Sequence, residues 1–204
     1  MAGRNHRFPW ALCSAACLLI LVLLWGDWRA VATRTDQYFS PKPAIGGAFS
    51  LQDTKGGTVT EKDLSGKPTL LFFGYTYCPD VCPTTLYEAS NWLQKLGPDG
   101  DRIQIFFVTV DPQRDTRDHL ASYMSAFDPR IVGLTGSAAE IDTIVAAYHA
   151  YAERTEGGDA DSYLINHTAS VYLLGKDGQF VDTIAYREDE AEALAKLRYL
   201  LRQG

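Results

Sequence analysis

Two short and nearly unbroken apolar runs constrain what this chain can fold into more than any other feature. Residues 69–73 (TLLFF) and 103–110 (IQIFFVTV) contain only isolated polar residues. Strands that helices cover on both faces have this composition. The segment between them, residues 83–96, reads as a helix that begins with a proline and ends before Gly97. A strand, a helix and a strand in this order predict a right-handed crossover between two central, parallel strands.

The rest of the pattern completes an α/β domain. The other expected elements are a helix over 116–126 capped by Asp115, a strand over 131–134, a helix over 137–151 that opens with a capping box, a hairpin of strands 168–174 and 180–185, and a final helix over 188–202. This order is that of a thioredoxin-like domain, in which a central sheet is flanked by helices and extended by a hairpin.

Composition and charge narrow the class of function. Of 204 residues, 46% are hydrophobic and 22% are charged, which excludes collagen-like, low-complexity and disordered chains. The net charge is -6, and beyond residue 32 the chain carries 16 basic and 24 acidic side chains, or -8. A part of the chain with this excess of negative charge is poorly suited to bind the negatively charged phosphate backbone of nucleic acids, and we expect no nucleic-acid partner.

Residues 1–32 are expected to be a membrane-targeting segment. Its core, residues 10–25, carries no charge and follows the basic residues Arg4 and Arg7. A helix of this length measures roughly 24 Å, slightly less than a hydrocarbon core of about 30 Å. An uncleaved anchor is favoured, and a cleaved signal peptide with a soluble product is the alternative, because the AVA sequence at 30–32 resembles a cleavage site.

Both readings of this segment place the rest of the chain on the non-cytoplasmic side of the membrane, in a periplasm or its equivalent. Residues 33–43 are polar, contain two prolines and suit a tether. Residues 44–204 are then the thioredoxin-like domain. Cys13 and Cys17 are interpreted as small apolar residues of the membrane helix.

The second cysteine pair, Cys78 and Cys82, lies in the sequence CPDVC between a buried strand and the start of a helix. Unpaired amides at a helix start favour negative charge, so a thiolate is stabilised there. With three residues between them, the two sulfurs can form a redox-active disulfide or bind one soft metal ion. A structural disulfide is the plain alternative, but a crosslink over so short a loop adds little stability.

A histidine is expected to face these cysteines. Thioredoxin-type reductases have a cis-proline just before the hairpin strand that faces their cysteines, but this chain has no proline after Pro129 and carries His167 at that place. Two thiolates and one imidazole select Cu(I), with zinc as the second choice, and imidazole also binds Cu(II) well. The metal-bound and disulfide forms exclude each other, because the ligands must be reduced.

Three sequences resemble the Sco/SenC family of copper chaperones, which take part in the assembly of cytochrome c oxidase. They are GYTYCPDVCP at 74–83, VTVDPQRDT at 108–116, and His167 ahead of VYLL at 171–174. The resemblance covers about residues 44–204 and the membrane tether. Two departures are Tyr77, where many members have histidine, and Arg117, where proline is common.

The resemblance implies that Cys78, Cys82 and His167 bind copper as Cu(I) or Cu(II). It further implies that the protein delivers copper to the CuA centre of the oxidase or keeps the cysteines of that centre reduced. The implied partners are the CuA-bearing subunit, a copper donor protein and a thiol reductant.

Two aspartates and a competing function complete the predictions. Asp80 lies between the cysteines and Asp111 follows a buried strand at its carboxyl end, so both are candidates for supporting the ligands. A thiol-disulfide oxidoreductase that reduces the cysteines of a partner protein is the alternative function, which leaves open whether the protein is an enzyme. His119 and His149 are interpreted as surface or packing residues of helices.

Overall fold

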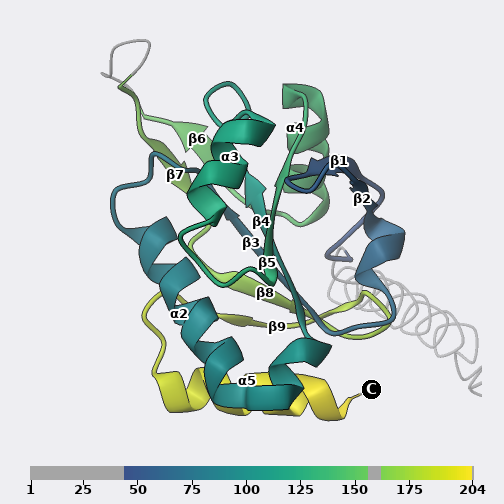
Figure 1. Cartoon of the computed structure of the whole chain (residues 1–204). Helices are drawn as coiled ribbons and strands as arrows, with labels where there is room; N and C mark the ends of the chain where they lie inside the picture. The colour runs from purple at the N-terminus through teal and green to yellow at the C-terminus, as the bar shows by residue number, and fades with distance from the viewer. Residues whose placement is uncertain (1–43, 156–161, 204) are drawn as a thin grey trace, which may run out of the picture. The chain divides into compact units, whose positions relative to one another are not determined.

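The two apolar runs form neighbouring central strands in the computed structural model, which describes residues 44–155 and 162–203 (Figure 1). β3 (Thr69–Gly74) and β4 (Gln104–Thr109) pair in parallel along their whole lengths. Every residue of β3 is buried. Burial on both faces therefore explains why these segments lack the alternation of a half-exposed strand.

Further strands extend this pair into a seven-stranded sheet in the order β2-β1-β5-β4-β3-β8-β9. β5 is parallel to β4, whereas β8 is antiparallel to β3 and the outer pairs are antiparallel as well. The added strands are β1 (Ser50–Asp53), β2 (Thr58–Thr60), β5 (Ile131–Thr135), β8 (Val171–Leu174) and β9 (Phe180–Ile184). Parallel strands at the centre and a hairpin at one edge confirm the predicted strand arrangement.

Helices cover both faces of the sheet. The helices are α2 (Val81–Leu96), α3 (Arg117–Met124), α4 (Ala138–Ala147) and α5 (Glu190–Arg202), with short 3₁₀ turns at η1 (Glu61–Leu64) and η2 (Gly97–Arg102). Phe72 packs in one core cluster with side chains of α2, α3 and α5, and its neighbour Phe73 packs in a second cluster with α4. Because successive strand residues point to opposite faces, the core has two layers. The thioredoxin-like α/β fold is confirmed.

Several helix ends differ from the prediction by one to four residues, and two of them have an identifiable cause. Thr116, rather than Asp115, caps α3, and its hydroxyl accepts a hydrogen bond from the backbone N–H of His119. The capping box of Ser137 is confirmed, but α4 ends at Ala147 instead of residue 151. The early end follows from His149, whose positive φ of 49° takes the backbone out of the helix.

A short two-stranded ribbon was missed by the sequence pattern. β6 (Ala152–Arg154) and β7 (Ile165–His167) pair antiparallel, with Ala152 opposite His167, and form a sheet of their own. The predicted strand over 168–174 begins only at Val171, because the chain before it belongs to this ribbon. We call β6 and β7 the ribbon; it carries the histidine of the predicted site.

The predictions for residues 1–32 and 33–43, including those for Cys13 and Cys17, concern residues outside the described part of the chain. Within the described ranges, every helix is too short or too polar to cross a membrane.

Asp115, the residue expected to cap α3, instead ties the cysteine loop (residues 75–82) to the sheet. Its side chain has no exposed surface and accepts hydrogen bonds from the Thr109 hydroxyl at 2.6 Å, the Thr76 hydroxyl at 2.6 Å and the Thr76 backbone N–H at 3.0 Å. Burial raises the pKa of Asp115 above its ordinary value of 3.8, and the hydrogen bonds act in the opposite direction. The fold therefore tolerates an unfavourably buried carboxyl in order to fix the loop.

This raised pKa predicts a specific dependence of stability on pH. A carboxyl whose pKa is higher in the folded state binds more protons there, so its contribution to stability is complete below the unfolded pKa and is lost as pH rises through the folded pKa. Relative to an Asp115→Asn variant, the wild-type protein should therefore become less stable as pH rises from about 4 towards neutral. Urea unfolding of both full-length chains in detergent checks this.

Asp128 offers a control of opposite sign. Hydrogen bonds from Arg130 hold the pKa of this carboxyl below its usual value. In the same experiment the wild-type protein should gain stability relative to Asp128→Asn as pH rises through the acid range. A stability difference for Asp115→Asn that is flat with pH, or that follows the Asp128 trend, would contradict the raised pKa.

Candidate metal centre

The two cysteine sulfurs lie where β3 gives way to α2. Cys78 precedes the helix and Cys82 is its second residue; the exposed fractions are 9% and 0%, and both thiols are reduced. Gly74 ends β3 directly beneath Cys82, and a Cβ atom at this glycine would stand 2.5 Å from the Cys82 sulfur and 2.7 Å from the Phe107 ring. A residue without a side chain is therefore needed for the buried sulfur to reach the sheet.

His167 reaches the cysteines from the end of the ribbon. Its Nδ1 lies 3.0 Å from the carbonyl oxygen of Thr168, and its Nε2 lies 3.4 Å from the Cys82 sulfur. A carbonyl only accepts hydrogen bonds, so in the neutral ring Nδ1 carries the proton and Nε2 turns its lone pair towards the sulfur. The rings of Phe72 and Tyr75 meet the imidazole edge-on, at centroid distances of 6.2 and 5.7 Å.

The three side chains form one compact donor set. The ligand atoms of Cys78, Cys82 and His167 all lie within 4.8 Å of one another. Metal–sulfur and metal–nitrogen bonds are about 2.0–2.3 Å long, so three donors spread around one ion are separated by roughly 3.7–4.0 Å. The set thus fits a single ion after a contraction of at most about 1 Å.

The two thiols differ in their electrostatic surroundings. Hydrogen bonds from the Cys82 thiol and from backbone N–H groups at the start of α2 hold the pKa of Cys78 well below its ordinary value, although burial acts in the opposite direction. Burial raises the pKa of Cys82, and the neighbouring Cys78 thiolate raises it further. Of the two thiols, Cys78 is therefore the one that loses its proton more readily.

The two candidate supporting aspartates bind other side chains, and neither belongs to the donor set. The exposed Asp80 carboxylate accepts a hydrogen bond from the Tyr186 hydroxyl at 3.0 Å and lies 3.8 Å from Arg187. Asp111 is buried, pairs with Arg114 and accepts a hydrogen bond from the Tyr163 hydroxyl at 2.6 Å. Asp111 is therefore linked to His167 only indirectly, through Tyr163 in the chain just before β7. A supporting role for either aspartate stays a prediction.

An aromatic stack flanks the cysteine loop on its exposed side. Tyr77 stacks on His119 at a centroid distance of 5.4 Å, and the Arg114 guanidinium lies 4.5 Å from the Tyr77 centroid. Nε2 of His119 is also 3.0 Å from the Thr76 hydroxyl. His119 and His149 are both exposed, in keeping with their interpretation as surface residues.

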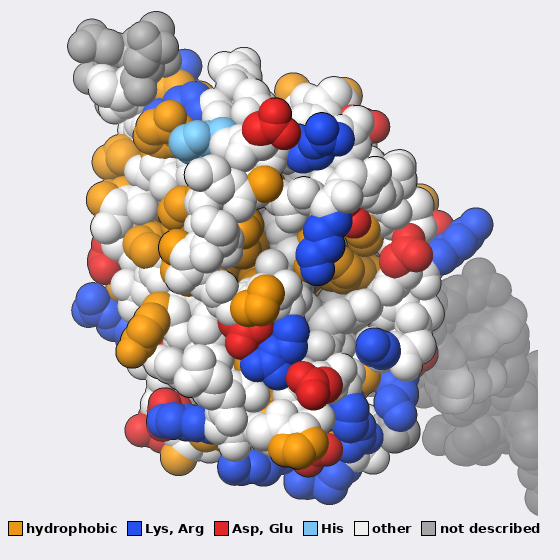
Figure 2. Space-filling model, viewed as in Figure 1, with side chains coloured by type: hydrophobic (Ala, Val, Ile, Leu, Met, Phe, Trp, Pro, Cys, Tyr) orange, Lys and Arg blue, Asp and Glu red, His pale blue; other side chains and the backbone are white. Residues whose placement is uncertain are grey.

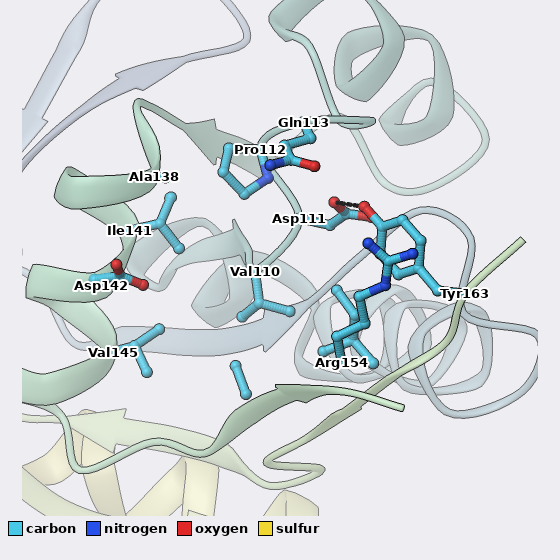
Figure 3. A pocket seen from close by; sticks show the side chains of 12 residues that line it. Val110, Asp111, Pro112, Gln113, Ala138, Ile141, Asp142, Val145, Arg154 and Tyr163 are labelled. Carbon is cyan, nitrogen blue, oxygen red and sulfur yellow. Dashed lines mark hydrogen bonds between the residues drawn. The ribbon is translucent and has the colours of Figure 1, made fainter. Parts of the chain in front are cut away.

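Sequence reasoning missed the tyrosines that surround the site. Tyr75 is adjacent to the cysteine motif and Tyr163 stands four residues before His167, yet nothing in the sequence indicates what their hydroxyl groups bind. A pocket of about 260 Å³ opens behind the ribbon, between Tyr163 and α4 (Figure 3). Its lining includes none of the three metal-ligand candidates.

Comparisons with known proteins agree with the geometry. A model of the SCO1/SenC family matches residues 38–202. Protein SCO1 homolog, mitochondrial, from Mus musculus is 36% identical over 163 residues, covering 79% of this chain and 57% of its own length. Protein SCO2, mitochondrial, from Saccharomyces cerevisiae is 38% identical over 157 residues, covering 76% and 52%. The chain thus spans a little over half the length of these curated relatives.

Solved structures agree in fold over most of the chain. Bradyrhizobium japonicum ScoI with copper bound is 46% identical at a TM-score of 0.72, covering 77% of this chain and 99% of that one. Yeast Sco1 with copper bound is 35% identical at a TM-score of 0.73, covering 79% and 91%. The sequence resemblance, the fold and the matched length agree, and the chain belongs to the SCO1/SenC family.

Proposed function

We propose that this protein is a copper metallochaperone that binds one copper ion through Cys78, Cys82 and His167 and assists assembly of the CuA centre of cytochrome c oxidase. The observation that carries the proposal is the convergence of two sulfurs from the cysteine loop and one imidazole nitrogen from the ribbon within 4.8 Å. Relatives of this chain have solved structures that are described as having copper bound.

The donor set favours copper over other metals. Thiolates are soft ligands that select Cu(I), whereas hard cations require oxygen ligands. Zinc is the second choice, because it binds the same atoms but usually completes four protein ligands in a structural site. The imidazole of His167 suits Cu(II), so one site serves both oxidation states of copper.

Transfer of copper follows from the open coordination position. A thiol of the partner enters beside the three donors before one of them leaves, so the ion is never free. The proposed partners are the CuA-bearing subunit as acceptor, a copper donor protein and a thiol reductant that keeps Cys78 and Cys82 reduced.

Exposed apolar side chains, including Tyr77 and Leu164, lie near the site and suit contact with a protein. Figure 2 shows hydrophobic side chains gathered on the side where β7 and the start of α2 lie.

The proposed location follows from the sequence. Residues 10–25 anchor the protein, and the copper-binding domain works on the non-cytoplasmic side of the membrane, with cleavage and release there as the alternative. Loading then takes place where exposed thiol pairs become oxidised, which is why a reductant is needed.

The second candidate function is thiol-disulfide exchange, and the asymmetry of the two thiols favours it. The Cys78 thiolate would attack a disulfide of the partner, form a mixed disulfide and release one partner thiolate. Cys82 would then lose its proton and attack the Cys78 sulfur, which releases the second partner thiolate. The protein ends as the Cys78–Cys82 disulfide, and an external thiol reductant supplies the two electrons that restore it.

Replacement of His167 separates the two functions. His167→Ala should weaken Cu(II) binding by well over tenfold, because loss of a group that merely orients a ligand already costs about 10–100-fold. The rate of exchange with a small disulfide should stay close to wild type. Competition titrations against a chelator and stopped-flow exchange measure the two effects, with His149→Ala as a control at an exposed histidine. Unchanged Cu(II) affinity would refute the metallochaperone proposal.

Copper and the disulfide should also exclude each other. In a full-length chain with Cys13→Ala and Cys17→Ala, oxidised glutathione should convert the metal-free protein to the Cys78–Cys82 disulfide and release two glutathione molecules. Prior loading with one equivalent of Cu(I) should prevent this, because both sulfurs are then occupied. Thiols counted after removal of copper with a chelator give the result. Equal oxidation with and without copper would show that the ion is not bound by both sulfurs.

A further inference from the structure

The ribbon that carries His167 is held to the domain by side chains rather than by sheet pairing. Among the described strands, β6 and β7 pair only with each other, whereas the cysteine loop continues directly from the central strand β3. The distance between His167 and the sulfurs therefore depends on the contacts that attach the ribbon to the domain.

Tyr75 makes the first of these attachments, from the domain to the ribbon. It is 1% exposed, and its hydroxyl accepts a hydrogen bond from the backbone N–H of Ile165 at 3.1 Å, two residues before His167. Its ring meets the His167 imidazole at an interplanar angle of 90°. Its backbone carbonyl accepts a hydrogen bond from the N–H of Cys78 at 3.2 Å. One residue thus contacts the segments of both ligand types.

Tyr163 makes the second attachment, from the chain just before β7 to the domain. Its hydroxyl donates to Asp111, which follows β4, and Figure 3 shows the two side chains meeting. Its ring lies between the guanidinium groups of Arg114 and Arg154, at 3.6 and 3.7 Å from the centroid. Arg114 also donates to the carbonyl oxygen of Tyr163 at 3.0 Å. The first attachment thus joins a side chain of the domain to the backbone two residues before His167. The second joins a side chain four residues before His167 to the domain.

The pocket behind the ribbon makes the position of the ribbon depend more strongly on these two attachments. It separates ribbon residues such as Ala152 and Ile165 from Ile141 and Val145 on α4. This space of about 260 Å³ is open to solvent, so the ribbon is not close-packed against α4 there, and Ile165 packs against the core cluster that contains Phe72. The two phenol hydroxyl groups therefore carry a larger share of the ribbon's position than they would in a close-packed interface.

We propose that Tyr75 and Tyr163 are positioning residues that hold His167 at bonding distance from an ion on Cys78 and Cys82, and so set the preference of the site between Cu(II) and Cu(I). The proposal rests on the proposed copper-binding function. Cu(I) is retained by two thiolates alone, whereas Cu(II) draws on the imidazole nitrogen. Loss of either hydroxyl then weakens Cu(II) binding selectively, although no ligand has changed.

The test uses the full-length chain with Cys13→Ala and Cys17→Ala and compares Tyr75→Phe, Tyr163→Phe and the double variant. Each single variant should lose about three- to tenfold in Cu(II) affinity, the range of one ordinary hydrogen bond, and the double variant should lose more. Cu(I) affinity should stay within about twofold of wild type. The electron paramagnetic resonance spectrum of Cu(II) should show weaker nitrogen coupling. Tyr148→Phe, a buried phenol in the opposite core cluster, is the matched control.

A double-mutant cycle with His167→Ala separates positioning from general damage to the fold. Once the imidazole is absent, Tyr75→Phe and Tyr163→Phe should have no further effect on Cu(II) affinity. Cu(II) affinities equal to wild type in all three phenylalanine variants would overturn the proposal, as would equal losses for Cu(I) and Cu(II) or an undiminished effect in the His167→Ala background. Failure of the proposed function is distinguishable, because His167→Ala itself would then leave Cu(II) affinity unchanged.

Discussion

The approach of the His167 imidazole to the Cys82 sulfur is the interaction on which the rest of the site depends. These atoms lie 3.4 Å apart although the residues are 85 positions apart in the sequence. The approach requires a central strand that is buried on both faces, so that the cysteine loop begins deep in the domain. It also requires Gly74, since any side chain there would occupy the space of the sulfur. The sheet thus serves the site by bringing a helix start and a remote histidine together.

The two halves of the site are held in different ways. Asp115 fixes the cysteine loop through three hydrogen bonds to Thr76 and Thr109, at the cost of a carboxyl buried in an unfavourable environment. A buried charge that costs stability persists when it determines a specific arrangement, and here it determines where the sulfurs lie. The ribbon has no comparable anchor in the sheet. The candidate metal centre therefore joins a firmly fixed pair of thiols to a histidine whose position is set by side-chain contacts.

Sequence reasoning succeeded where composition or order along the chain carries the signal. Burial on both faces shows directly in residues 69–73, and His167 was found from its place before the last hairpin. The sequence predicts Asp115 as a helix cap because capping is recognised from neighbouring residues, but Thr116 beside it satisfies the same rule. The actual role of Asp115 depends on its hydrogen bonds to Thr76, which is 39 residues away in the sequence. The contacts of Tyr75 and Tyr163 were not predictable for the same reason: one hydroxyl binds a backbone amide across 90 residues and the other a carboxylate across 52.

The proposed function requires the protein to hold its ion and also to release it, and the burial of the donors assigns these tasks to different atoms. Cys82 has no exposed surface, so an incoming thiol of the partner cannot reach the ion past it, whereas Cys78 retains some exposure. The exposed apolar side chains nearby, such as Tyr77 and Leu164, would bring a partner to this same side. Ligand exchange would then begin on the side of Cys78 while the buried Cys82 sulfur still holds the ion. Because three donors leave coordination room for a fourth, the proposed transfer can begin with the partner bound to copper before this protein releases it, and no step requires a free ion.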